Sequence, residues 1–443
     1  MAELDPAWLR ELSELLRIPS LSADAAHADD VLHAGEWVCD FIRRAGGEAG
    51  IVRQNGSPLA VGELRASTGA KRAPTVLVYG HFDVQPPAPL DEWESDPFEP
   101  AVRDGYLYAR GVADDKGQLY LLLKTAALLA AEGALPVNVR IACDGEEETG
   151  GHSIVDFLAQ DERKASACVI FDSGMLARGM PAFVVATRGL VYFHVRVRTG
   201  ARDLHSGMYG GVALNAMHAL MQALGGVLQR DGRLPEPLRA GIVPPTAQEL
   251  ADWAALPPGA AELADQGARP VDARAAQEFY LRTFAEPAVD VNGLAGGSPQ
   301  LQKTVLPVLG EANVSVRLAP GQDVEEIAAA FERLLRKAAP AGADVELVRM
   351  SGSPPGLVDP GAPAIALGLD VFERAFGVRP LLVRSGGTLP IVAALAEHEI
   401  PTVVTGVSLP DANIHSPNER LLVEYIPLGI EAARQLFSAW AAL

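Results

Sequence analysis

Short apolar runs that each lead into a potential metal ligand constrain the fold of this chain most strongly. Residues 76–79 are apolar and lead into His81, residues 137–142 lead into three consecutive glutamates, and residues 167–171 lead into Asp172. Such runs are typical of buried parallel strands. Open α/β sheets bind ligands at the carboxyl ends of their strands. The pattern therefore predicts an α/β fold in which these side chains meet at one edge of a sheet.

One further candidate ligand lies far along the chain. His415 follows another apolar run, at 402–404, in a chain of 443 residues. Because His415 must meet ligands from residues 81–172 in one site, the segment between them is expected to be an insertion. The helices and alternating strands of this segment predict a small α+β domain. The expected strands are 191–197, 312–318 and 345–350, and the expected helices are 214–228 and 325–337.

The length of the chain exceeds what one hydrophobic core normally supports, so two domains are expected. We place the first part of the catalytic domain at residues 1–187, the inserted domain at 188–352, and the second part of the catalytic domain at 353–443. Within the insertion, residues 232–300 are rich in Pro, Ala and Gly. This stretch is expected to be irregular apart from short helices such as 247–253.

Charge and cysteine content limit the partners and the compartment. The formal net charge of −19 argues against nucleic acid and anionic membranes as partners, because both would repel the chain. Cys39, Cys143 and Cys168 have no zinc-type spacing and leave at least one thiol unpaired, which fits a reducing compartment. No signal peptide and no apolar run of about 18 residues is visible. A cytoplasmic protein without a membrane partner is expected.

Two imidazoles and three carboxylates are sufficient to hold a pair of divalent ions if one carboxylate bridges them. Asp114, at the start of Asp114-Asp115-Lys116-Gly117, is the candidate for the bridge. One glutamate of 146–148 would bind metal while a neighbour takes a proton from the attacking water, and spacing alone leaves the register open. Such ligands suit zinc, manganese and cobalt alike. The five candidate ligands are His81, Asp114, Glu148, Asp172 and His415.

Three other residues have two interpretations each. Asp83 could orient the ring of His81 by accepting its second N–H, or it could be a simple turn residue. Arg384, before two glycines, could bind a carboxylate with its planar guanidinium or form a structural ion pair. His205, considered in isolation, is more typical of a surface or core histidine than of a catalytic one.

Longer stretches resemble the M20 metallopeptidases, specifically their dipeptidase branch with the carnosine dipeptidase-like enzymes. The segment Gly80-His81-Phe82-Asp83-Val84-Gln85-Pro86 resembles the G-H-x-D-V-Q-P sequence of that branch. The resemblance spans nearly the whole chain. Its other local matches are residues 93–100, 111–117, 204–207, 303–307, 385–387 and 415–419.

The resemblance implies a zinc-peptidase-like α/β/α catalytic domain with an inserted α+β lid and dimerisation domain. Two divalent ions, zinc or alternatively manganese or cobalt, would share Asp114 as the bridge. His81 and Asp172 would hold one ion, and Glu148 and His415 would hold the other. The resemblance also fixes Glu147 as the general base and implies a cis peptide bond after Asp114.

The resemblance further implies a homodimer in which His205 enters the partner's site and stabilises the oxyanion. The substrate's carboxylate end would contact Thr304, Arg317, Gly387 and Thr388. Two departures, Gly151 in place of a common serine and residues 298–302 in place of a glycine-rich approach to Lys303, leave the substrate pocket open.

The expected activity is hydrolysis of small peptides, with dipeptides as the first choice of substrate. Deacylation of N-acyl or N-succinyl amino acids and carboxypeptidase activity are the alternatives within the class. A non-catalytic dimeric binding protein is the alternative from another class.

Overall fold

The computed structural model describes residues 5–161 and 163–443, and these form two compact units. The first unit comprises the chain up to Val185 together with Val358–Val383 and Ala394–Leu443. The second unit comprises Ala186–Leu357 and Arg384–Ala393. The predicted insertion, 188–352, corresponds to most of the second unit. The segment Arg384–Ala393 was predicted to belong to the second part of the catalytic domain. It groups instead with the second unit, where Arg384 bonds to Glu249 and Thr388 bonds to Arg317.

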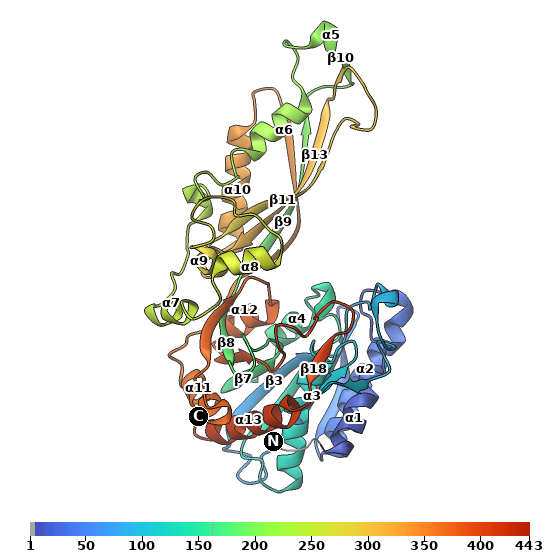
Figure 1. The fold of residues 1–443 in the computed structure, drawn as a ribbon, viewed down its shortest axis with the longest axis vertical. Helices are drawn as coiled ribbons and strands as arrows, with labels where there is room; N and C mark the ends of the chain where they lie inside the picture. Colours follow the sequence, from blue (N-terminus) through green and yellow to red (C-terminus); the bar gives the residue numbers. More distant parts are fainter. Residues whose placement is uncertain (1–4, 162) are drawn as a thin grey trace. The chain divides into compact units, whose positions relative to one another are not determined.

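A six-stranded mixed sheet forms the centre of the first unit (Figure 1). Four of its strands are parallel to their neighbours, so their carboxyl ends lie at the same edge of the sheet. The other two strands extend the sheet on one side, where each pairs with its neighbour in antiparallel fashion. In sheet order the strands are β1 (Glu48–Gln54), β2 (Ser57–Leu64), β6 (Asn138–Asp144), β3 (Thr75–His81), β7 (Ala167–Phe171) and β17 (Thr402–Thr405).

Helices cover both faces of this sheet. A Cβ at Gly80 would lie 2.9 Å from Leu119 of α3, whereas Leu77 lines the same pocket as Leu158 of α4. Because side chains alternate along a strand, positions 77 and 80 face opposite sides of β3. The α/β/α architecture predicted for this unit is therefore confirmed. Its main helices are α1 (Pro6–Leu16), α2 (Ala28–Arg44), α3 (Lys116–Ala131), α4 (Ser153–Gln160), α11 (Pro363–Phe376) and α13 (Tyr425–Trp440).

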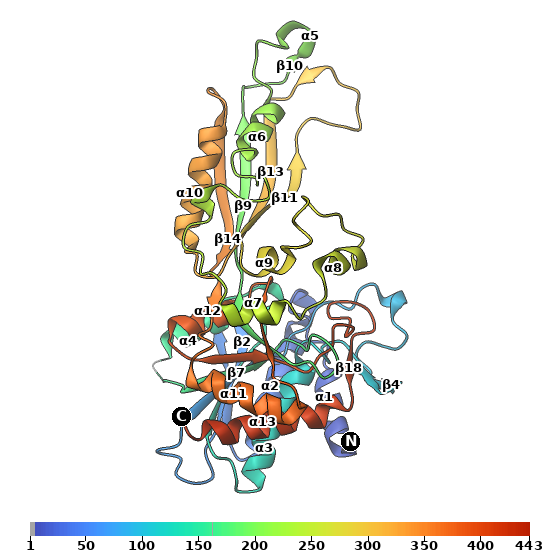
Figure 2. The same cartoon turned by 60° about the vertical axis from the view of Figure 1, so that its left-hand side comes forward.

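Helix α3 lies between the central sheet and two other helices, α1 and α13. Eleven of its residues are buried, which explains why the sequence of this helix is almost uncharged. The helix contacts β3 and β7 on one side and α1 and α13 on the other. Figure 2 shows α11 beside α13, and these two helices pack against each other. The loop before α3, which carries Asp114, is thus fixed at the centre of the first unit.

The second unit is a four-stranded antiparallel sheet with helices packed on one face (Figure 1). Burial alternates along β9, so every second side chain enters the core. The rings of Phe193 and Phe331 stack at the centre of this core, 4.7 Å apart between centroids. In sheet order the strands are β11 (Ala288–Ala295), β13 (Leu309–Leu318), β9 (Gly189–Arg198) and β14 (Asp344–Ser353), covered by α6 (Ala216–Leu224) and α10 (Val324–Ala338).

Two sequence predictions need correction in the second unit. Residues 288–295 were expected to be irregular, but they form the edge strand β11. A bulge between Val291 and Gly293 breaks its alternation, and most of its side chains are exposed, so the strand lacks an apolar pattern. Helix α6 spans Ala216–Leu224 rather than 214–228, because Asn215 caps its start and Gly225 and Gly226, which disfavour a helix, follow its end. The predicted helix at 247–253 is present as α7 (Ala247–Trp253).

A small two-stranded sheet extends the second unit. Strands β10 (Leu204–His205) and β12 (Val305–Leu306) pair in antiparallel fashion, and the short helix α5 (Ser206–Tyr209) follows β10.

Within the part of the chain that the structure describes, no helix is both long and apolar enough to cross a membrane.

Candidate metal centre

The carboxyl edge of the central sheet brings four candidate ligands together. His81 is the last residue of β3, Asp172 follows β7 directly, and His415 lies in the loop after β17. Glu148 lies in a short 3-10 turn, Glu147–Thr149, that follows β6. Asp114 lies just before α3. These five side chains were predicted from strand ends and loops scattered over more than 300 residues of sequence.

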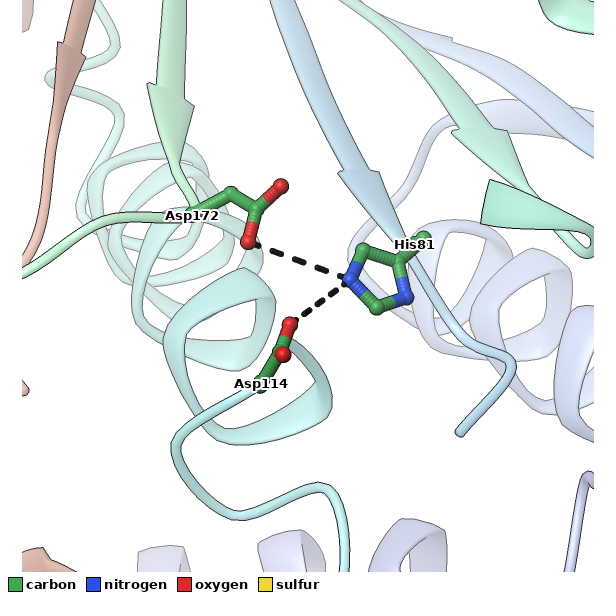
Figure 3. Close-up of side chains that lie close together, drawn as sticks. All are labelled: His81, Asp114 and Asp172. Carbon is green, nitrogen blue, oxygen red and sulfur yellow. Dashed lines mark hydrogen bonds and ion pairs between the residues drawn. The ribbon is translucent and has the colours of Figure 1, made fainter. Parts of the chain in front are cut away.

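Asp114 presents its two carboxylate oxygens to two different imidazoles. Its Oδ1 lies 3.0 Å from Nε2 of His81, and its Oδ2 lies 2.9 Å from Nε2 of His415. Asp172 Oδ1 is 3.9 Å from the same nitrogen of His81. Figure 3 shows Asp114 and Asp172 both facing the ring of His81. Glu148 Oε2 is 3.1 Å from the nitrogen of His415. The geometry thus forms two groups of ligands that share Asp114.

The donor set fits two divalent metal ions. One group is His81, Asp114 and Asp172, and the other is Asp114, Glu148 and His415, with the ligand atoms of each group all within 4.8 Å of one another. Oε1 of Glu148 is buried and has no hydrogen-bond partner among the described residues. Two nitrogens and several carboxylate oxygens are ligands that zinc accepts, and a shared carboxylate is common in two-metal sites.

The charge balance of the site also favours cations. Burial raises the pKa of Asp172 well above its usual range, and burial raises the pKa of Glu147 to about 7. Hydrogen bonds to Asp114 and Glu148 raise the pKa of His415 to about 10. Without metal, the buried carboxyl groups therefore tend to keep their protons, and His415 tends to stay positively charged beside them. Two divalent ions would supply the opposite charge that this group of buried carboxylates requires.

Asp83 connects the two halves of the site. Nδ1 of His81 lies 3.1 Å from the carbonyl oxygen of Asp83 and 3.4 Å from its Oδ1. Neither acceptor can donate, so Nδ1 carries the proton, and Nε2, which faces Asp114 and Asp172, is the nitrogen that would bind a metal. The carboxylate of Asp83 also accepts bonds from the backbone N–H groups of Glu147 (3.2 Å) and Glu148 (3.1 Å). Asp83 therefore lies where the sequence predicted an acceptor that orients His81.

Glu419 holds the loop that carries Asp114, and sequence reasoning assigned it no role. Its buried carboxylate accepts bonds from Arg110 at 2.6 Å and from the backbone N–H groups of Gly111, Ala113 and Asp114. The only signal in the sequence was its place at the end of the matched stretch 415–419. The peptide bond between Asp114 and Asp115 is cis, as the resemblance implied.

Gln85 is a second residue that the sequence did not single out. Its Nε2 donates to Oε2 of Glu148 at 2.9 Å and to the backbone carbonyl of Glu148 at 3.1 Å. Gln85 therefore fixes both the side chain and the backbone of one ligand. It lies in the matched stretch 80–86, but no charge or spacing distinguished it.

The candidate substrate-binding residues lie in the second unit. His205 is exposed on β10, and the carbonyl of Thr304 accepts a bond from the backbone N–H of Ser206. Arg317 donates to the hydroxyl of Thr388 at 3.0 Å, next to the exposed Gly387. The metal ligands all belong to the first unit.

Of the two interpretations of Arg384, the structure shows the ion pair. Its Nε lies 2.6 Å from Oε1 of Glu249, and both side chains are almost fully buried. Its remaining nitrogens bond to Glu249 and to the carbonyls of Val243 and Pro244. All three nitrogens of the Arg384 guanidinium therefore bond within the protein, so the predicted role in substrate binding is withdrawn.

Comparison with known proteins identifies the family. The sequence profile of peptidase family M20/M25/M40 matches residues 77–439, which includes every candidate metal ligand. The chain belongs to this family.

Individual relatives agree in length and fold with this assignment. A cysteinylglycine-S-conjugate dipeptidase from Corynebacterium striatum is 29% identical over 93% of this chain and 90% of its own length. The human Beta-Ala-His dipeptidase is 27% identical over 78% of this chain and 71% of its own length. The crystal structure of an M20 family metallo-carboxypeptidase from Sulfolobus solfataricus has a TM-score of 0.85 and 23% identity, covering 99% of this chain and all of that one.

Proposed function

We propose that this protein is a two-metal dipeptidase that hydrolyses dipeptides with a free C-terminal carboxylate. The observation that carries the proposal is Asp114, whose two oxygens face two separate imidazoles, each accompanied by a further carboxylate. Relatives that match most of the chain are named as dipeptidases of cysteinylglycine conjugates and of Beta-Ala-His. A dipeptide is therefore preferred over N-acyl or N-succinyl amino acids and over longer peptides.

His81, Asp172, Glu148 and His415, with Asp114 between them, would hold two ions, and we propose zinc, with manganese or cobalt as alternatives. The ions would supply Lewis acidity to the scissile carbonyl and to the attacking water. Asp83 keeps the proton of His81 on Nδ1 and fixes the turn that carries the glutamates.

Glu147 acts as the general base in this proposal. Burial raises the pKa of its carboxyl to about 7, close to the value that suits proton transfer at neutral pH. Its carboxylate takes the proton of the attacking water and passes it to the leaving nitrogen. The adjacent Glu148 is held by Gln85 and is not available for this task.

His205 stabilises the developing oxyanion. The Nδ1 atom of His205 accepts a hydrogen bond from the backbone N–H of Gly207 at 3.1 Å. A neutral ring in this arrangement must carry its proton on Nε2, which is then free to donate. The chemistry requires such a donor at the oxyanion.

A homodimer would bring His205 of one subunit to the site of another. Apolar side chains are unusually exposed around α5 and α6, since Met208 is 72% exposed, Val212 85% and Met221 53%. The edge strand β14 also exposes Met350, at 63%. Such surfaces are typical of interfaces with another chain, and an open sheet edge is a common site of pairing.

A cytoplasmic location completes the proposal. Cys39, Cys143 and Cys168 are all buried and unpaired. Burial raises the pKa of Cys39 to about 11, so the thiol stays protonated. Free thiols of this kind fit a reducing compartment.

One incubation tests the proposed activity against its alternatives. The metal-reconstituted enzyme is incubated with a pool of dipeptides, longer peptides, N-acyl amino acids and N-succinyl amino acids, and the loss of each is followed by mass spectrometry. We expect selective loss of dipeptides. Selective loss of the acylated compounds would show a deacylase, and shortening of the longer peptides would show a carboxypeptidase. Loss of none would overturn the proposal.

A further inference from the structure

We infer that Arg188 is a specificity-determining residue that, together with Arg317, binds the substrate's free carboxylate. The inference rests on the proposed function, because it concerns the same substrate. Arg188 precedes β9 directly, and Arg317 lies opposite Leu190 on the neighbouring strand β13. The sequence singled out Arg317 only through the resemblance, and it gave no indication for Arg188.

The backbone and side chain of Arg188 are fixed against the glycine-containing segment 385–387. Its N–H lies 3.1 Å from the carbonyl oxygens of both Ser385 and Gly387, and its Nε donates to the carbonyl of Gly386 at 3.2 Å. Arg317 in turn donates to the hydroxyl of Thr388, the next residue of the same segment. Residues 385–388 therefore hold two guanidinium groups in place.

Among the described residues, no Asp or Glu forms an ion pair with Arg188 or Arg317. The other buried or half-buried arginines of the second unit are all paired. Arg282 lies 2.6 Å from Asp272, Arg384 lies 2.6 Å from Glu249, and Arg239 contacts Glu286. An arginine that is half-buried and unpaired is thus a departure from the pattern of this unit.

The electrostatics of Arg188 agree with this geometry. Burial and the charge of Arg317 lower the pKa of Arg188 to about 10, and Asp290 opposes this shift only through its more distant charge. A substrate carboxylate would offset the repulsion between the two guanidinium groups, which bind carboxylates through paired N–H donors.

The test compares a free acid with its amide. Steady-state rates for alanylglycine and alanylglycinamide are measured with the metal-loaded wild type, Arg188→Gln, Arg188→Lys and Arg196→Gln. The last is the matched control, an exposed arginine on β9 that is paired with Glu311. Metal content and circular dichroism establish that each variant is folded.

We expect the wild type to prefer the free acid. Arg188→Gln should raise KM for alanylglycine about 10- to 100-fold, as loss of one hydrogen bond to a charged group does, with little change for the amide. Arg188→Lys keeps the charge but not the planar group, so its KM should lie between the two, and Arg196→Gln should match the wild type.

Two results would overturn the inference. One is an unchanged preference for the free acid in Arg188→Gln, and the other is an equal loss for both substrates, which would indicate a general structural role. A wild type that cleaves neither substrate would instead overturn the proposed function, and the inference with it.

Discussion

At the residue scale, the candidate metal site depends on carboxylates that lie outside both ligand groups. Asp83 fixes His81 and the turn that carries Glu147 and Glu148, while Glu419 fixes the loop that carries Asp114. Each of these carboxylates is buried and accepts several bonds at once. A substitution of either one is expected to shift a ligand without removing it.

The general base gives the first prediction. Glu147→Gln keeps the size of the side chain but removes the proton acceptor, so kcat should fall by about 100- to 10,000-fold. Metal content should stay unchanged, because Glu147 is not among the ligand groups. Rates and metal analysis of the same preparation measure both. Full activity in this variant would exclude Glu147 as the base.

Glu419→Gln gives the second prediction. The variant leaves the buried Arg110 without its charged partner and weakens the bonds that hold residues 111–114. Metal affinity should fall about 10- to 100-fold, as is usual when a residue that orients a ligand is changed. Competition with a chelator measures it. Asp411→Asn, which removes an exposed partner of Arg420, is the control and should have no effect. Equal affinities in all three proteins would refute the role of Glu419.

At the scale of elements, the parallel strands were the part of the fold that could best be predicted from the sequence. His81 and Asp172 were predictable because apolar runs end at these residues, and parallel strands end at one edge of the sheet. Glu419 and Gln85 were not, since their roles depend on loops that meet only after folding. Strand β11 was missed because its bulge and exposed side chains remove the apolar alternation.

The pair of Glu249 on α7 and Arg384 on β16 (Leu381–Ser385) gives the third prediction. Burial acts to raise the pKa of Glu249, but the bonds from Arg384 and Thr246 lower it below the ordinary value of 4.5. A carboxyl whose pKa is depressed on folding contributes stability above its unfolded pKa, and this contribution is lost as the pH falls through the folded pKa.

Glu249→Gln should therefore destabilise the second unit by about 3–5 kcal/mol at pH 7, because Arg384 is left buried and unpaired. The difference in the free energy of unfolding between this variant and the wild type should narrow as the pH falls below 4.5, the ordinary pKa of a glutamate. Urea unfolding at a series of pH values measures it. A difference that is independent of pH would show that the charge of Glu249 does not contribute.

At the scale of the whole molecule, the chain returns to each unit after leaving it. The order of the segments was predictable because His415 had to meet ligands from the first part of the chain. The return of Arg384–Ala393 to the second unit was not predictable, since it depends on the bonds of Arg384 to Glu249 and of Thr388 to Arg317. Both are contacts between segments distant in the sequence.

The proposed homodimer gives the fourth prediction. Val212→Glu places a charge on the most exposed apolar side chain of the second unit, so it should weaken dimerisation while the fold stays intact. Sedimentation velocity should show a dimer for the wild type and a larger fraction of monomer for the variant. Activity should fall with the fraction of dimer if His205 acts across the interface. A fully active wild-type monomer would contradict this.

The number of metal ions bound per chain tests the central claim most directly. The two ligand groups share Asp114, so the wild type, reconstituted and dialysed, should retain two divalent ions in elemental analysis. Asp114→Asn should weaken both sites and retain fewer than one. A wild type that holds at most one ion, or an Asp114→Asn variant that keeps both, would contradict the account of a two-metal hydrolase.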